Sequence, residues 1–145
     1  MNFEFYAAHD PRAAETARWV ADRIPGCARG WDACVAMRVF RAETIGAVIY
    51  HDWNPEAGTL CMSAAGGSGW LTRSVLRAMH GYVFDDAGCQ LAVLQVSEKN
   101  AAMRRIALAY GYCEFVIPRL RGRNEAECLL TLTDDAWRAS RFHKG

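Results

Sequence analysis

The chain has 145 residues, of which 52% are hydrophobic and 11% aromatic, and its formal net charge at pH 7 is +1. Such a composition is typical of a packed globular protein and excludes an intrinsically disordered chain. The length predicts a single domain over residues 1–145, with a sizeable core. A charge so close to zero gives no reason to expect nucleic acid as a partner.

Six cysteines and four histidines are spread along the chain without a CxxC pair or another spacing typical of metal ligands. We therefore expect free thiols and no metal cofactor. The first residues lack the basic region and apolar stretch of a signal peptide, and no run approaches the roughly 18 apolar residues that cross a membrane. These features predict a reduced, cytoplasmic protein with no membrane contact.

Hydrophobic periodicity and turn residues divide the chain into short strands and helices. Asp10 followed by Pro11 is typical of a helix start, because aspartate caps the helix and proline suits its first position. The expected elements, in chain order, are a strand at 3–8, a helix at 11–24, strands at 34–40, 45–51 and 59–64, a helix at 70–87, a strand at 91–96, a helix at 100–110, strands at 112–117 and 127–132, and a short helix around Trp137.

This order of elements predicts the fold class. The short link between the strands at 34–40 and 45–51 indicates an antiparallel hairpin. Strands separated by whole helices indicate parallel pairing in the middle of the chain. We therefore expect an α/β fold in which a central mixed β-sheet carries helices on both faces.

A glycine-rich turn, Gly66-Gly-Ser-Gly69, lies between the strand at 59–64 and the following helix. Backbone N–H groups at such a turn, together with the helix dipole, suit a phosphate or pyrophosphate. Thr72 and Arg73 would add a hydroxyl and a guanidinium, although a plain flexible turn gives the same pattern. Neither GxxxxGK[ST] nor a GxGxxG after the first strand is present, so nucleotide hydrolysis and dinucleotide redox chemistry are not expected.

Asn100 stands where the chain leaves the apolar strand at 91–96 and enters a helix that ends at Gly111 and Tyr112. An asparagine here caps the helix, or it holds a polar group at the opening of the strand. Both roles are compatible with the sequence.

Taken together, these segments resemble the GNAT superfamily of acyl-CoA-dependent N-acyltransferases. Asn100, Gly111 and Tyr112 keep that family's spacing from an asparagine-led helix to a Gly-aromatic pair. The resemblance covers roughly residues 34–132. The segments 70–76 and 84–89 resemble a subgroup common in bacteriophage genomes.

Two positions depart from the family pattern. Trp70 and Thr72 stand where the pyrophosphate loop of the family has two glycines. Ala107 stands seven residues after the asparagine, where many members carry a tyrosine that protonates the departing thiolate. Tyr110 is the candidate substitute for that acid.

The resemblance implies acetyl-CoA as co-substrate and an amine as acceptor. The strand at 61–65 would then offer backbone groups to the pantetheine arm and the thioester carbonyl. For the catalytic base, the available groups are His51, which adjoins Asp52, and Glu98. The residues expected to contact the cofactor are Met62, Ser63, Ala64, Gly66, Gly67, Ser68, Gly69, Trp70, Leu71, Thr72, Arg73, Asn100 and Arg105.

Three functions follow from these patterns. The first is an acetyl-CoA-dependent N-acetyltransferase that uses His51, Glu98 and Tyr110 in catalysis on an unidentified small-molecule or protein amine. The second is a non-catalytic protein of the GNAT fold that binds CoA or serves as a phage-associated component. The third is recognition of acidic partners through Arg119, Arg121 and Arg123, which otherwise form a solvated turn. A homodimer is a possible assembly.

Overall fold

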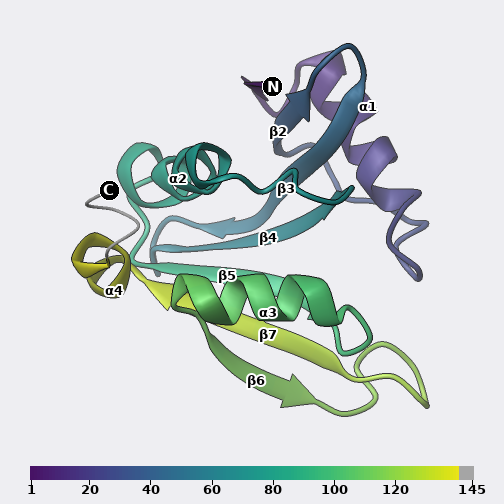
Figure 1. The fold of residues 1–145 in the computed structure, drawn as a ribbon, viewed down its shortest axis with the longest axis vertical. Coiled ribbons are helices and arrows are strands. Elements are labelled where there is room, and N and C mark those ends of the chain that lie inside the picture. The colour runs from purple at the N-terminus through teal and green to yellow at the C-terminus, as the bar shows by residue number, and fades with distance from the viewer. Residues whose placement is uncertain (141–145) are drawn as a thin grey trace. The chain divides into compact units, whose positions relative to one another are not determined.

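The computed structural model describes residues 1–140 (Figure 1). Its elements are β1 (Asn2–Tyr6), α1 (Pro11–Ala21), β2 (Val35–Phe40), β3 (Thr44–Asn54), β4 (Thr59–Gly66), α2 (Arg73–Gly81), the π-helical turn η1 (Tyr82–Asp86), β5 (Leu91–Ser97), α3 (Ala101–Tyr110), β6 (Cys113–Ile117), β7 (Glu127–Thr133) and α4 (Asp134–Ala139). Within this part of the chain, no helix is long and apolar enough to span a membrane.

The strands follow the order β1-β2-β3-β4-β5-β7-β6, and the α/β class with a mixed sheet is confirmed. The chain forms two compact units. The first unit comprises residues 1–52 and 62–81, and the second comprises residues 53–61 and those from 82 onward. Strand β4 contributes its first three residues to the second unit and the rest to the first.

The first unit is built on antiparallel strands. The predicted hairpin is confirmed, because β2 pairs antiparallel with β3 and places Met37 opposite Val48. Strand β1 pairs antiparallel with the other side of β2. Side chains on one face of these strands form a core with α1, whose buried members are Tyr6, Ala13, Val20, Ala36, Ala47 and Ile49.

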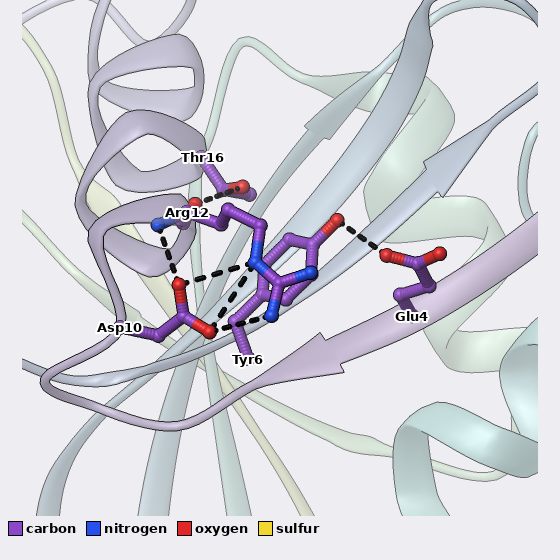
Figure 2. A network of polar contacts seen from close by, with 5 residues as sticks. All are labelled: Glu4, Tyr6, Asp10, Arg12 and Thr16. Carbon is purple, nitrogen blue, oxygen red and sulfur yellow. Dashed lines mark hydrogen bonds and ion pairs between the residues drawn. The ribbon is translucent and has the colours of Figure 1, made fainter.

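Helix α1 begins at the predicted cap. The carboxylate of Asp10 accepts a hydrogen bond from the Arg12 amide at 2.9 Å, and the Arg12 guanidinium donates to the same carboxylate (Figure 2). These bonds lower the pKa of Asp10. The guanidinium also lies over the Tyr6 ring, 4.6 Å from its centroid, while the Tyr6 hydroxyl donates to Glu4. The helix ends at Ala21, earlier than expected.

Helix α2 packs on the opposite face of the first unit's strands. Successive residues of a strand point to opposite faces, so Tyr50 lies across β3 from Ile49. The Tyr50 hydroxyl donates to the carbonyl of Met79 in α2 at 2.8 Å. The expectation of helices on both faces of the sheet thus holds within this unit.

The helix predicted at 70–87 is wrong at both ends. It begins only at Arg73, because the Trp70 side chain is buried and the Thr72 hydroxyl accepts from the Val75 amide at 3.2 Å, as a capping group does. It stops at Gly81, and the next five residues form the π-helical turn η1. The tertiary contact of Trp70 therefore overrides the helical periodicity of the sequence.

The second unit contains β5, β7 and β6, with β7 in the middle (Figure 1). Both neighbours pair antiparallel with β7, and the register places Leu94 and Glu114 on either side of Leu130. Strands β5 and β6 are therefore parallel but not adjacent. Helix α3 is tied to β6 by Arg104, whose guanidinium donates two 2.8 Å bonds to the Glu114 carboxylate and lowers its pKa.

Candidate functional site

A histidine, an aspartate and a serine form one hydrogen-bonded chain in the first unit. His51 lies in β3, and its Nδ1 is 2.6 Å from Oδ2 of Asp52. Its Nε2 is 2.9 Å from Oγ of Ser63 in β4. His51 and Ser63 are 7% and 4% exposed, so this polar pair is satisfied inside the protein rather than by bulk water.

The backbone at Asp52 helps to form this chain of contacts. Asp52 has φ 54°, in the left-handed region that residues with a β-carbon seldom adopt and that aspartate tolerates better than most. In this conformation its carboxylate lies beside the ring of the preceding residue. The carboxylate is largely exposed, whereas the imidazole it contacts is buried.

The hydrogen bonds determine where the proton of a neutral imidazole lies. An ionised carboxylate only accepts hydrogen bonds, so Nδ1 of His51 carries the proton and donates it to Asp52. Nε2 is then an acceptor, and the hydroxyl of Ser63 donates to it. The arrangement is a base, Nε2 of His51, that accepts a hydrogen bond from the Ser63 hydroxyl.

Trp31 covers one face of the imidazole. The two rings are stacked, with centroids 5.7 Å apart and an interplanar angle of 27°. Trp31 also lines a cavity of about 270 Å³ on the α1 side of the unit, formed by Ala8, Ala13, Ala14, Ala17, Arg18, Arg29, Gly30, Trp31, Asp32, Ala33 and Cys34. The ring of Trp31 is therefore shared between the histidine and a cavity the size of a small ligand.

Cys34 in this cavity is not a nucleophile. Burial and the nearby charge of Asp32 raise the pKa of its thiol to about 11. At neutral pH the thiol is protonated, and only a thiolate attacks carbonyl groups efficiently. The cavity accordingly offers apolar and charged lining residues rather than a reactive sulfur.

The glycine-rich turn connects β4 to α2 in the same unit. The Gly67 amide donates to the carbonyl of Ile45 at 3.0 Å, which continues the contact with β3 past the end of β4. The Trp70 amide donates to the carbonyl of Gly67, and Gly69 has φ 77°, a conformation that favours glycine. Residues 66–69 are exposed. The turn is therefore ordered, and the amides of Gly67 and Trp70 donate hydrogen bonds to other groups of the protein.

Trp70 is a core residue. Its side chain is 4% exposed and lies against Gly46 of β3 and Gly66 of β4. A β-carbon on either glycine would overlap the indole ring. The tryptophan that replaces a family glycine in the turn is therefore accommodated by glycines on two strands. Any contact of Trp70 with a cofactor is left to its backbone.

The remaining cofactor positions of the first unit are half-buried or buried, except for Arg73. Met62 is fully buried, and Ala64, Leu71 and Thr72 are half-buried, whereas Arg73 is exposed at the start of α2. The Thr72 hydroxyl is already bonded to the Val75 amide. Strand β4 would therefore meet a ligand mainly through its backbone.

Asn100, Glu98 and Tyr110, candidate residues of the second unit, have structural partners there. Asn100 caps α3, since its Oδ1 accepts from the Met103 amide at 3.1 Å. The Glu98 carboxylate accepts from the Ala126 amide. The Tyr110 hydroxyl, on a 4% exposed residue, accepts from the indole N–H of Trp137 at 2.9 Å. Arg105 is exposed on α3.

The sequence placed His51 beside Asp52, but it did not connect this pair with Ser63 and did not single out Trp31. Ser63 was expected to contact the cofactor rather than the histidine. The signal was present in part, because His51 and Ser63 are polar residues that adjoin the apolar stretches of two neighbouring strands. Which residues of β3 and β4 lie side by side depends on the conformation of the loop at 55–58, which the sequence alone does not define.

Comparison with known proteins establishes the family. The model of the acetyltransferase (GNAT) domain matches residues 1–112. The chain belongs to the GNAT acetyltransferase family. No curated protein matches this sequence.

Solved structures share its fold. A putative acetyltransferase is 16% identical, with a TM-score of 0.66 over 76% of this chain, and this chain spans 63% of that one. The F149A mutant of the spermidine N-acetyltransferase SpeG from Vibrio cholerae is 14% identical, with a TM-score of 0.62, 72% of this chain covered and 68% of that one. A chimera of SpeG from Vibrio cholerae and hSSAT is 12% identical, with a TM-score of 0.69 and coverage of 94% and 99%. At these identities the likeness concerns the fold alone.

Proposed function

We propose that the protein is an acetyl-CoA-dependent N-acetyltransferase that acetylates an amine. The observation that carries the proposal is the hydrogen-bonded pair of His51 and Ser63 on the strands β3 and β4 of a GNAT-family chain. The pair supplies a buried base of the kind that amine acetylation requires, because an ammonium group cannot attack a carbonyl until it has lost a proton.

In this proposal CoA lies along β4 and the glycine-rich turn. The backbone of residues 62–66 would bond the pantetheine arm, and the amides of Ser68 and Gly69 would meet the pyrophosphate, since those of Gly67 and Trp70 are bonded within the protein. Helix α2 has nine residues, and its N-terminus with Arg73 adds positive charge to the same place. Asn100 and Arg105, which belong to the second unit, stay predictions as cofactor contacts.

The reaction forms a bond between the amine nitrogen and the acetyl carbon and breaks the bond between that carbon and the CoA sulfur. The proton of the amine goes to the base, and the CoA thiolate takes up a proton. We favour His51 as the base over Glu98, because the carboxylate of Glu98 already caps the Ala126 amide. Tyr110 stays a prediction for the acid, and its hydroxyl accepts the indole proton of Trp137.

The acceptor is proposed only as an amine. Two of the solved structures reported above carry spermidine N-acetyltransferase in their names, and polyamines are accordingly sensible first substrates to test. A cytoplasmic location, a single domain over residues 1–145, a homodimer and a relationship to phage proteins stay predictions.

Calorimetric titration with acetyl-CoA and CoA tests the proposal. We expect binding by the wild-type protein and weaker binding by Gly67→Val and by Arg73→Glu, which alter the turn and the charge at the start of α2. Arg77→Glu is the matched control, because it makes the same charge reversal one turn later on an exposed position of α2. No binding at millimolar ligand would contradict the proposal. Equal binding by Gly67→Val and Arg73→Glu would contradict the pyrophosphate position.

The second candidate is a non-catalytic GNAT protein that binds CoA. Ala107 favours it, because this residue is only 3% exposed and offers no phenol where many family members have one. Thiol release from acetyl-CoA, measured across a panel of polyamines, amino acids and peptides, separates the two. Binding without thiol release across the panel would support the second candidate.

A further inference from the structure

We infer that the hydroxyl of Ser63, and not the imidazole of His51, is the group that touches the acceptor amine, and that Asp52 is a positioning residue for His51. The inference rests on the proposed function and deepens it. Ser63 would carry the proton from the amine to the imidazole. Three observations support it: the two hydrogen bonds of the His51 ring, the stacking of Trp31 on that ring, and the ability of the Ser63 hydroxyl both to donate and to accept a proton.

Both nitrogens of the imidazole are engaged. Nδ1 of His51 is held by the carboxylate of Asp52 at 2.6 Å, and Nε2 is held by Oγ of Ser63 at 2.9 Å. An amine that approached Nε2 directly would have to displace the serine hydroxyl. Displacement would leave the hydroxyl of a 4% exposed residue without its partner, which costs about 1–3 kcal/mol.

The imidazole of His51 is also covered on one of its faces. Trp31 stacks on one face of His51, and the histidine is 7% exposed. Asp52 and Trp31 together fix the plane of the ring, and the carboxylate fixes the tautomer. The lone pair of Nε2 is therefore aimed at one atom, Oγ of Ser63.

A hydroxyl can work in series with such a base. It has one proton, which it donates to Nε2 of His51, and two lone pairs, which can accept a proton from an amine. In the transfer, the amine proton moves to Oγ of Ser63 as the hydroxyl proton moves to Nε2. The amine nitrogen bonds to the acetyl carbon, the sulfur leaves, and no bond to Ser63 forms. Asp52 then stabilises the imidazolium, as a carboxylate beside a catalytic histidine does.

The position of Ser63 suits this role. It lies in β4, the strand proposed to bind the thioester through its backbone, so the proton acceptor and the acetyl group would share one strand. It is on the same face of the unit as Ala47, Ile49 and α1, because it is bonded to His51, and residues 47, 49 and 51 of β3 point to one face. Trp31, which stacks on His51, also lines the cavity on this side, whereas Ser63 itself is not among the residues that line it.

Two substitutions of Ser63 and one control at another position test the relay. Ser63→Ala should lower kcat for the best amine about 100-fold, since removal of a group that transfers protons typically costs 10²–10⁴-fold. KM for acetyl-CoA should stay within about twofold, and Ser63→Thr should restore most of kcat because it keeps the hydroxyl. Ser74→Ala, an exposed position on α2, is the control and should keep the wild-type kcat.

Asp52→Asn tests the positioning role with a spectroscopic measurement. In the wild-type protein the ¹⁵N shifts of His51 should report the tautomer protonated on Nδ1, and Asp52→Asn should give a mixture together with a lower kcat. Asp135→Asn, an exposed aspartate of α4, should change neither. The tautomer is measured without substrate, so it is independent of whether the protein acetylates amines.

The outcomes separate the two proposals. Full kcat in Ser63→Ala together with CoA binding would overturn the relay and leave the acetyltransferase proposal standing. Acetylated Ser63, detected by mass spectrometry after acetyl-CoA addition, would overturn the relay in favour of a covalent step. No CoA binding by the wild-type protein would overturn the proposed function and, with it, the role of Ser63 in acetyl transfer.

Discussion

The indole of Trp70 lies so close to Gly46 that a β-carbon on the glycine would overlap the ring. Trp70 follows the glycine-rich turn, and Gly46 lies 24 positions earlier in β3 (70 minus 46). The contact attaches the turn to the strand and buries a large side chain where GNAT proteins usually have a glycine. It makes the shape of the turn dependent on a strand residue that no local pattern connects to it.

This contact predicts non-additive effects of substitution. Trp70→Ala should lower the free energy of unfolding by about 3–5 kcal/mol through the cavity it leaves. Gly46→Ala should cost about 1–3 kcal/mol, because the added methyl collides with the indole. In the double variant the penalty of Gly46→Ala should vanish, since the ring is gone. Urea unfolding of the four proteins measures the coupling, and additive penalties would contradict the contact.

His80 predicts how stability depends on pH. Burial lowers the pKa of His80 from 6.5 to about 4, and its Nδ1 lies 2.7 Å from the carbonyl of Leu76. Between these values the unfolded chain binds a proton that the folded protein does not. Stability is therefore full above 6.5 and falls as the pH decreases to about 4, by roughly 3 kcal/mol in total.

His80→Asn should remove this loss between pH 6.5 and 4, because asparagine keeps a donor for Leu76 and does not titrate. Equilibrium unfolding at a series of pH values measures it. His9→Asn, on an exposed histidine, serves as the control and should follow the wild-type curve. If the free energy of unfolding of His80→Asn still fell between pH 6.5 and 4 as it does in the wild-type protein, another group would be the cause of that fall.

Two substitutions of Asn100 should affect stability and CoA binding differently. Asn100→Ala should cost about 1 kcal/mol, because the Met103 amide loses its capping acceptor. Asn100→Asp should keep the cap and the stability. If Asn100 also contacts CoA, as the sequence pattern predicts, Asn100→Asp should weaken CoA binding through repulsion of its phosphates. Asn124→Ala, on an exposed loop residue, should alter neither measurement.

Substitution of Tyr110 tests whether this residue is the catalytic acid. Tyr110→Phe removes the acceptor of the Trp137 indole proton, and a buried donor without a partner costs about 1–3 kcal/mol. Thermal unfolding should show this loss. If Tyr110 is also the acid, kcat should fall at temperatures where the variant stays folded. An unchanged kcat would remove Tyr110 from the catalytic residues while leaving its structural role intact.

Local chemistry accounts for most of the elements that the sequence predicts. Asp10 and Asn100 both cap helices as expected, because a short polar side chain bonds amides only two or three residues away. The hairpin of β2 and β3 was also predictable, since alternation and a short link are local features. The corrections concern Trp70 and the π-helical turn after Gly81, where contacts distant in sequence compete with periodicity.

The order of the strands in the sheet could not be predicted from local sequence features. The chain forms β5, α3, β6 and then β7, yet β7 lies between β5 and β6. All three strands are apolar and of similar length, and the amino-acid pattern of an edge strand differs little from that of its neighbour. Pairing was decided by which backbone groups meet when the whole unit packs.

The family pattern around Asn100, Gly111 and Tyr112, the class of fold and the helix caps were determined by the sequence itself, because each depends on spacing or on groups a few residues apart. The chain of Asp52, His51 and Ser63, its cover by Trp31 and the burial of Trp70 against Gly46 were decided only by the tertiary structure. These contacts join residues that lie 12 to 24 positions apart, except for the Asp52 pair, whose geometry depends on a left-handed backbone. Hydrogen bonds and ring contacts extend over a few ångströms, so only folding brings such residues within their range.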